Sequence, residues 1–263
     1  MKFVSLIFDY NLTKMINSGR LWSVEAYKNK DYIFEYSAAS IATILDKNHD
    51  IKYEVWTDDV NLLSKKLSFY NVQTKNLDIL GKTKEISEWT KHTFCFWPLI
   101  KFYESFALNN EHVIKLDNDL TCLKNCDELS SWEHAVVWKF ERKCNNGRDY
   151  WGEKYCASKE FGTDKFDIYN IGIFSIGKKN LSSVSEIAQL CEKMINVDAS
   201  HIIRFPENTK AKAKYWSCSD QTSNCYFIHT KNIPIKQTND FFEHHCYVKT
   251  KQECIERAKY LLK

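Results

Sequence analysis

Two rhythms of apolar and polar positions alternate along the first half of the chain. Short aliphatic and aromatic runs, typical of buried strands, occur at residues 3–8, 52–56 and 113–116. Apolar positions spaced three and four apart, typical of helices, lie between them at residues 37–45, 60–69 and 96–108. Strand, helix, strand, helix, strand is the order expected for a parallel sheet with crossover helices.

The second half of the chain is less regular. Strands are predicted at residues 135–140 and 169–176, and polar segments without periodicity, 141–166 and 203–214, are predicted to be long loops. Capping-box patterns begin at Ser183 and Thr250 and predict helices after them. No change in composition marks a linker, so we predict a single α/β domain.

The charge and composition of the 263 residues exclude several classes of protein. Lys and Arg total 37 and Asp and Glu total 34, which gives a net charge of +3. No block of like charge is long enough to indicate a nucleic-acid-binding tail, so we expect no nucleic-acid partner. Only 7 Gly and 3 Pro occur among plentiful aromatic residues, which argues against disorder and against a Gly-rich phosphate loop.

The sequence contains ten cysteines, and their spacing bears on whether the protein works in a reducing compartment. Cys122 and Cys126 come closest to a metal-binding pair, but no matching Cys or His pair follows at zinc spacing. We therefore expect buried, reduced thiols.

Few apolar residues follow Met1 before Asp9, and no run approaches the roughly 20 apolar residues that a membrane span needs. These features predict a cytoplasmic protein without a secretory signal or membrane span.

Two carboxylates end the strand predicted at residues 113–116. Asp117 and Asp119 follow it with Asn118 between them. Because side chains alternate along an extended chain, Asp117 and Asp119 point to the same side and can converge on one cation. Oxygen ligands suit Mg²⁺ or Mn²⁺, which keep open positions for phosphate oxygens. The motif therefore predicts a metal site that serves a diphosphate-carrying substrate.

Polar residues also follow the first two predicted strands. Asp9 and Tyr10 follow the first, and Asp58 follows the second. Ligands of open α/β sheets bind beyond the carboxyl ends of the strands, so we expect these residues to meet the Asp117–Asp119 pair at one edge. Asp also favours turns, and the role of a simple turn residue stays open for Asp9 and Asp58.

The Asp117-Asn118-Asp119 motif and three later segments resemble those of GT-A type glycosyltransferases. Residues 169–174 (YNIGIF) are similar to the F-N-x-G strand of the glycogenin and bacterial galactosyltransferase group. Asp220-Gln221, followed by Asn224, resembles that group's D-Q-x-x-x-N helix start. His244-His245 lies where the group places a metal-binding histidine.

The sequence also departs from that group. The usual Lys-Pro-Trp after the histidine is missing, and only Lys249 and Lys251 remain. Phe96-Trp97 and residues 151–154 resemble small viral and capsule-type transferases instead. The resemblance therefore implies a GT-A fold, a Rossmann-like, mostly parallel central sheet with flanking helices, and leaves the subfamily open.

The resemblance also implies a set of metal ligands. It implies that Asp117 and Asp119 hold Mn²⁺ or Mg²⁺, with His244 or His245 completing the shell through a neutral ring nitrogen. The interval from His245 to Lys251 fits the family better, which favours His245. Lys249 would supply a second positive charge to the diphosphate. Adjacent histidines also occur as solvated or buried structural residues, so that reading stays open.

Sugar-nucleotide contacts are implied at several further positions. Lys101, on the predicted helix 96–108, could reach a phosphate or ribose. Asp220 and Gln221 would bind the transferred sugar or assist catalysis, although Asp220 could equally cap its helix. The remaining residues expected to line the donor site are Asp9, Tyr10, Asp58, Asn118, Asn170 and Gly172.

The resemblance thus predicts a metal-dependent glycosyltransferase that moves a sugar from a nucleotide-diphosphate sugar, with UDP favoured, to a glycan or other hydroxyl acceptor. Residues 1–125 would form a nucleotide-binding lobe and residues 126–263 an acceptor and sugar lobe of one domain. A sugar-phosphate nucleotidyltransferase is the main alternative, but it would want a Gly-rich loop after the first strand. A non-catalytic protein that binds carbohydrate or sugar nucleotide is the other.

Overall fold

The computed structural model describes ten parts of the chain. They are residues 2–7, 30–57, 60–76, 113–130, 133, 135–145, 153–195, 197, 219–245 and 248–261.

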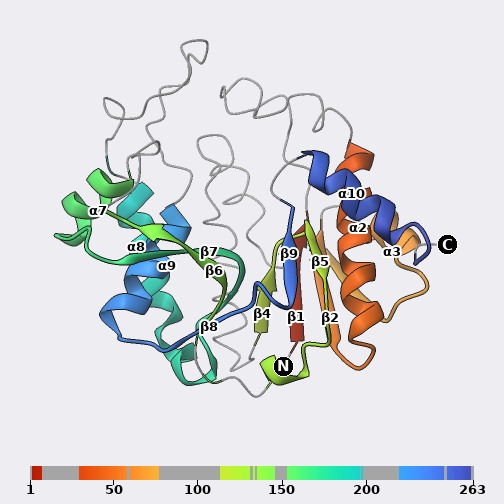
Figure 1. The fold of residues 1–263 in the computed structure, drawn as a ribbon, viewed down its shortest axis with the longest axis horizontal. Coiled ribbons are helices and arrows are strands. Elements are labelled where there is room, and N and C mark those ends of the chain that lie inside the picture. The colour runs from red at the N-terminus through yellow and green to blue at the C-terminus, as the bar shows by residue number, and fades with distance from the viewer. Residues whose placement is uncertain are drawn as a thin grey trace, which may run out of the picture.

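A seven-stranded mixed sheet forms the centre of the molecule (Figure 1). The strands are β1 (Lys2–Ile7), β2 (Lys52–Thr57), β3 (Val72–Asn76), β4 (Val113–Leu116), β6 (Ala135–Lys143), β7 (Asp167–Ser175) and β8 (Ile235–Gln237), in the order β3-β2-β1-β4-β7-β6-β8. Neighbours are parallel except that β7 runs antiparallel to both β4 and β6. The sheet is therefore mostly parallel, as the alternation of strands and helices predicts.

Helices flank the sheet in two groups (Figure 1). The first group is α2 (Lys30–Lys47), α3 (Val60–Lys66) and α10 (Val248–Ala258), and α10 packs against α2. The second is α7 (Glu153–Phe161), α8 (Val184–Ile195) and α9 (Ser219–Thr230), and α9 packs against β7. A short helix α6 (Asp127–Ser130) and a 3-10 helix η2 (Lys178–Ser183) complete the described helices.

A second sheet has only two strands, β5 (Leu120–Cys122) and β9 (Phe242–His244), which run antiparallel. It joins a segment directly after β4 to one more than a hundred residues later. Both strands are three residues long, which is too short for an alternation of apolar and polar positions to reveal them in the sequence. This small sheet carries the C-terminal part of the chain back to the central sheet.

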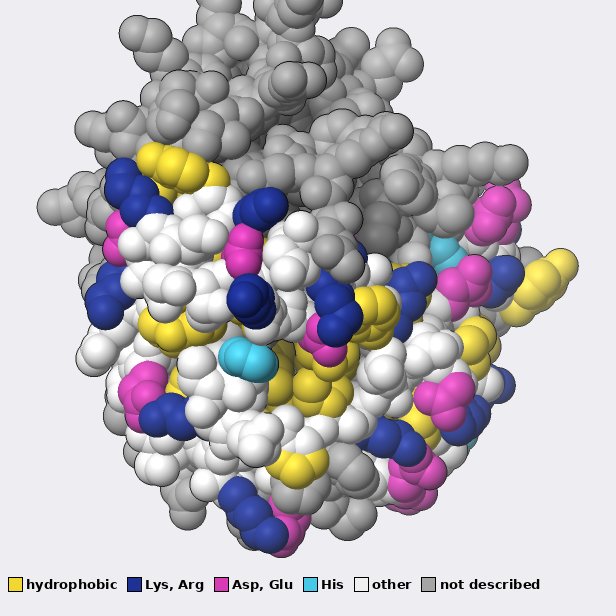
Figure 2. Space-filling model, turned by 60° about the vertical axis from the view of Figure 1, so that its left-hand side comes forward, with side chains coloured by type: hydrophobic (Ala, Val, Ile, Leu, Met, Phe, Trp, Pro, Cys, Tyr) yellow, Lys and Arg dark blue, Asp and Glu magenta, His cyan; other side chains and the backbone are white. Residues whose placement is uncertain are grey.

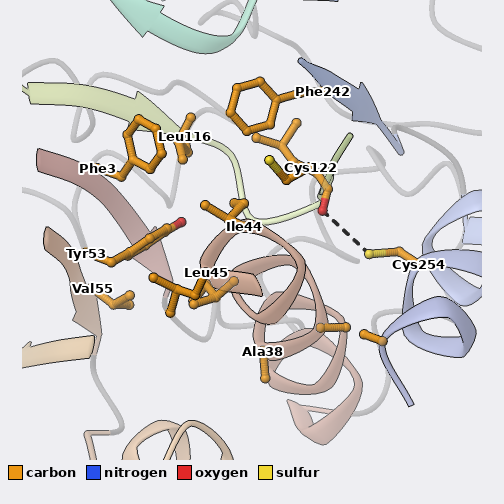
Figure 3. Packing of buried hydrophobic residues seen from close by; sticks show 14 of the residues in the cluster. Phe3, Ala38, Ile44, Leu45, Tyr53, Val55, Leu116, Cys122, Phe242 and Cys254 are labelled. Carbon is orange, nitrogen blue, oxygen red and sulfur yellow. Dashed lines mark hydrogen bonds between the residues drawn. The ribbon is translucent and has the colours of Figure 1, made fainter. Parts of the chain in front are cut away.

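The main hydrophobic core lies between the central sheet and helices α2 and α10 (Figure 3). The Phe3 ring makes edge-to-face contacts with Tyr53 and Phe242, with ring centroids 6.2 and 6.4 Å apart. Cys254 of α10 reaches the carbonyl of Leu120 in β5 at 3.6 Å. Residues from both ends of the chain therefore share one core, which fixes β5 and β9 against the parallel strands.

Most predicted elements that fall on described residues are confirmed. The runs at 52–56 and 113–116 are β2 and β4, and the capping box at Ser183 precedes α8. The helix predicted from Thr250 begins slightly earlier, at Val248. The helix predicted at 96–108 and the loop predicted at 203–214 lie outside the described residues.

The long loop predicted at 141–166 is wrong. β6 continues to Lys143, and α7 occupies Glu153–Phe161. Among the described strands, β8 pairs with residues 135–137 and only β7 lies beside the rest of β6, and residues 139–143 are exposed or half-buried. An exposed strand of this kind shows no apolar alternation, and its sequence looks like a loop.

The carboxyl ends of β1, β2 and β4 lie at the same edge of the sheet, because these three strands are parallel neighbours. This confirms the predicted meeting of strand ends. Of the residues expected there, Asp9, Tyr10, Asp58 and Lys101 lie outside the described residues. Asp117 and Asp119 are described, and the candidate site is built around them.

The composition-based expectations can be examined on the same described residues. All seven cysteines among them are buried and have free thiols. None of the described helices combines the length and the hydropathy that crossing a membrane requires. On the face shown in Figure 2, Lys and Arg side chains stand beside Asp and Glu side chains, and no continuous basic surface covers its described part.

Candidate functional site

The two carboxylates lie in the short connection between β4 and β5. The backbone N–H of Asp117 donates to the carbonyl of Gly172 in β7, at 2.6 Å. The carbonyl of Asp119 accepts the N–H of His245, at 2.8 Å. The connection is therefore held from both sides, and Asp119 is buried with only 8% of its surface exposed. Asn118, between them, is half-buried.

His244 joins the two carboxylates from the far end of the chain. The antiparallel pairing of β5 with β9 sets His244 opposite Leu120. Its Nε2 lies 3.1 Å from Oδ1 of Asp119 and 3.6 Å from Oδ2 of Asp117. One ligand atom from each of the three residues falls within 4.8 Å of the others, so the group could hold a metal ion.

The His244 ring is fixed by its surroundings. Trp138 meets it edge to face, with centroids 5.1 Å apart, and is itself anchored by an indole N–H that donates to the carbonyl of Phe242 at 2.9 Å. On another side lies Gly172, where an added Cβ would fall 2.6 Å from Cε1 of His244. A side chain at position 172 would therefore force the imidazole to shift, because the ring occupies the space of that side chain.

His244, and not the His245 that the sequence favours, lies in the described group with Asp117 and Asp119 that could hold a metal ion. Successive side chains of an extended segment point to opposite sides, and His245 turns away from the carboxylates. It is fully buried, and its Nε2 lies 2.7 Å from Oγ1 of Thr121. Burial lowers the pKa of His245 below its ordinary value of 6.5. Its burial and its contact with Thr121 favour the reading of His245 as a buried structural residue.

Lys115 belongs to the site although the sequence analysis did not single it out. It lies on β4 with 6% of its surface exposed. Its ammonium group donates to Oδ1 of Asp117 at 2.5 Å and to the carbonyl of Ile171 at 3.1 Å. A signal was available, because a residue two positions before Asp117 on a strand shares its face.

A second polar cluster adjoins the metal cluster through Asn170. Its amide nitrogen donates to Oε1 of Glu141 at 2.9 Å, and Oε2 of Glu141 accepts from Gln221 at 2.9 Å. Oδ1 of Asn170 accepts the N–H of Gly172 at 2.8 Å, beside the His244 ring. Arg142 also donates to Glu141, at 2.6 Å. Two predicted residues, Asn170 and Gln221, therefore meet around Glu141, which no sequence pattern indicated.

Two predicted residues are placed only by their backbone. Asp220 is the second residue of α9, and Lys249 is the second residue of α10. Both side chains lie outside what the structure describes, so their roles stay predictions.

Comparison with known proteins shows the fold. No family model matches the sequence, and no curated protein matches it. The solved galactosyltransferase LgtC, in complex with donor and acceptor sugar analogues, matches with a TM-score of 0.53 at 12% identity, over 100% of this chain and 95% of that chain. Mouse xyloside xylosyltransferase 1 in its apo form gives 0.49 at 10% identity, over 90% and 84%. The chain has the GT-A fold of the LgtC structure.

The ligand atoms of the cluster could hold a divalent metal ion. Two carboxylate oxygens and one imidazole nitrogen come together at the edge where parallel strands end. Three ligands leave positions open for a substrate, whereas a structural zinc site is closed by four, commonly including Cys. The described residues therefore fit a metal that also binds substrate.

The contact between Gly172 and His244 generates one prediction. Gly172→Ala should displace the imidazole and weaken Mn²⁺ binding by about 10–100-fold, the usual effect of disturbing a ligand's support. Mn²⁺ titration followed by electron paramagnetic resonance measures the effect. In a His244→Ala background the same Gly172→Ala change should cost little more, since no imidazole remains to be moved. Equal losses in both backgrounds would show that the contact is not the cause.

The burial of His245 generates a prediction about pH. The unfolded chain binds a proton on this histidine more readily than the folded chain, so folding stability should be full above the unfolded pKa near 6.5 and fall as pH drops below it. His245→Gln should lose less stability over this range than the wild type. Urea unfolding between about pH 5 and 7.5 tests this. His229→Gln, at an exposed position in α9, should keep the wild-type pH dependence.

Proposed function

We propose that this chain is a divalent-metal-dependent glycosyltransferase. It would transfer a sugar from a nucleotide-diphosphate sugar, with UDP-sugars as the first candidates, to a hydroxyl of a glycan or similar acceptor. The observation that carries the proposal is the meeting of Asp117, Asp119 and His244 at the carboxyl edge of a GT-A sheet. In open α/β folds this edge is where ligands bind.

The metal cluster would bind the leaving group. Asp119 Oδ1, Asp117 Oδ2 and His244 Nε2 face one another and are the atoms that would hold the metal. When bound, Mn²⁺ or Mg²⁺ supplies positive charge that stabilises the departing diphosphate. The chain's own contribution is rigidity, because Trp138 and Gly172 hold the imidazole in place before substrate arrives.

The Glu141 cluster would bind the transferred sugar. A carboxylate and two amides from β6, β7 and α9 offer both donors and acceptors, which suits sugar hydroxyls. Asn170 lies next to Gly172 and hence next to His244, so a sugar bound at Glu141 would have its diphosphate within reach of the metal cluster. Gln221, and Asp220 before it on α9, remain our candidates for direct contact with the reacting sugar.

The two halves of the chain would bind different parts of the substrates. Residues 1–125 would form the nucleotide-binding lobe, where Asp9, Tyr10, Asp58, Lys101 and Asn118 are still predicted to line the nucleotide. Residues 126–263 would form the acceptor and sugar lobe. The central sheet and the core that they would share support treating the two lobes as one domain.

A panel of sugar nucleotides tests the function. The protein is mixed with UDP- and GDP-sugars with and without Mn²⁺, and thermal stability and nucleotide release are recorded. The proposal expects a Mn²⁺-dependent increase in thermal stability with one class of sugar nucleotide and metal-dependent release of its nucleoside diphosphate. Stabilisation by a nucleoside triphosphate with a sugar phosphate would instead indicate a nucleotidyltransferase. Binding without turnover over a broad set of acceptors would contradict transfer.

The role of Asp119 gives a specific prediction. Asp119→Ala should reduce metal-dependent turnover by at least about a hundredfold, since a direct ligand matters no less than the groups that support one. The variant should stay folded, because the change removes one of two neighbouring negative charges. Asp240→Ala is the matched control, since Asp240 is an exposed carboxylate paired with Lys124 at 2.7 Å. Full metal-dependent turnover by Asp119→Ala would refute the assignment.

A further inference from the structure

Lys115 is an unusual residue for the middle of a sheet. Lysine is almost never fully buried unless it is paired, and Lys115 lies on β4 between β1 and β7. Its ammonium group has two described acceptors, the Asp117 carboxylate and the carbonyl of Ile171. Both acceptors belong to the candidate site or to the strand beside it. The buried charge of Lys115 therefore acts on the candidate site and not on the surface of the protein.

The ammonium group of Lys115 gives the two carboxylate oxygens of Asp117 different partners. Lys115 takes Oδ1, at 2.5 Å, while Oδ2 faces Nε2 of His244 at 3.6 Å. Asp117 can then offer only one oxygen to a cation in this arrangement. A bidentate carboxylate would fill a coordination position that a phosphate oxygen needs. The lysine contact thus fixes the carboxylate orientation that leaves this position open.

Lys115 also changes the charge of the cluster. Asp117 and Asp119 contribute two negative charges, and the lysine cancels one of them. Counted over these described groups, a divalent cation entering the cluster with a neutral His244 would leave an excess of one positive charge in a largely buried place. A diphosphate group carries the negative charge that offsets this excess. Charges in such places interact more strongly than in water, so the imbalance has an energetic effect.

We propose that Lys115 is a positioning residue that makes divalent-cation binding depend on the diphosphate of the substrate. It does so by holding Asp117 in single-oxygen ligation and by placing a fixed positive charge beside the cation. The metal binds weakly alone and tightly together with a nucleoside diphosphate. The coupling is reciprocal, so the nucleotide is also bound tightly only with the metal. This inference rests on the proposed function and adds to it a reason for ordered or joint binding.

Replacing the lysine tests the proposal through binding rather than activity. Lys115→Met should raise the affinity for Mn²⁺ alone by at least about tenfold, because it removes a repelling charge. The same change should weaken UDP binding at saturating Mn²⁺, and the wild-type coupling, typically about 5–150-fold, should largely disappear. Electron paramagnetic resonance of free Mn²⁺ gives the first affinity, and titration calorimetry with UDP and GDP gives the second. A purely structural lysine would never produce tighter Mn²⁺ binding when removed.

Two further variants separate charge from folding. Lys115→Gln keeps a hydrogen-bond donor near Asp117 and removes only the charge, so it should also bind Mn²⁺ more tightly. Lys143→Met makes the same charge change at an exposed β6 position that pairs with Asp167 at 3.8 Å, and it should leave both affinities unchanged. If neither Lys115 variant folds, the wild type still decides, since equal Mn²⁺ affinity with and without UDP overturns the proposal.

The outcomes distinguish this inference from the function beneath it. A wild-type protein that binds neither UDP nor GDP at saturating Mn²⁺ refutes both. A wild type with strong coupling, together with Lys115 variants whose Mn²⁺ affinity is unchanged or lower, refutes the role of Lys115 and leaves the glycosyltransferase proposal standing.

Discussion

The pairing of β5 with β9 is the constraint on which the candidate site depends. It sets His244 opposite Leu120, one residue after Asp119, although the two strands are more than a hundred residues apart in the sequence. The N–H of His245 donates to the carbonyl of Asp119 and extends the same register. Phe242 carries β9 into the core against Phe3, and Cys254 of α10 contacts β5. Core packing around β5 and β9, outside the three possible ligands themselves, therefore determines which histidine meets the carboxylates.

Charge at this edge is concentrated in a small volume and is only partly compensated by the described residues. Asp119 and Lys115 are both buried, and buried charges are costly unless they are paired. The lysine pairs with Asp117, and His244 lies within 3.1 Å of Asp119. Gly172 connects these groups, since its carbonyl accepts from Asp117 and its missing side chain makes room for His244. The same glycine links the metal cluster to Asn170 and the Glu141 cluster. A substrate would thus meet a site whose parts are already oriented.

The sequence predicted the parallel strands and the acidic pair because those signals are local. The aliphatic run before Asp117 has a strand's length and ends at the carboxylates, and the structure agrees. The choice between His244 and His245 was out of reach, because it depends on the register of two strands of three residues each. Glu141 was missed because the exposed half of β6 resembles a loop. Lys115 could have been found from its place two residues before Asp117, where alternation puts both side chains on one face.

The central claim is that Asp117, Asp119 and His244 form a metal site that serves a diphosphate. Its most direct test is a crystal structure of the wild-type protein grown with Mn²⁺ and UDP, with anomalous diffraction recorded to locate manganese. We expect one strong peak bonded to Asp119, to Oδ2 of Asp117 and to Nε2 of His244, with UDP phosphate oxygens on its open side and Lys115 still on Oδ1. A peak elsewhere, or UDP bound away from these three residues, would contradict it.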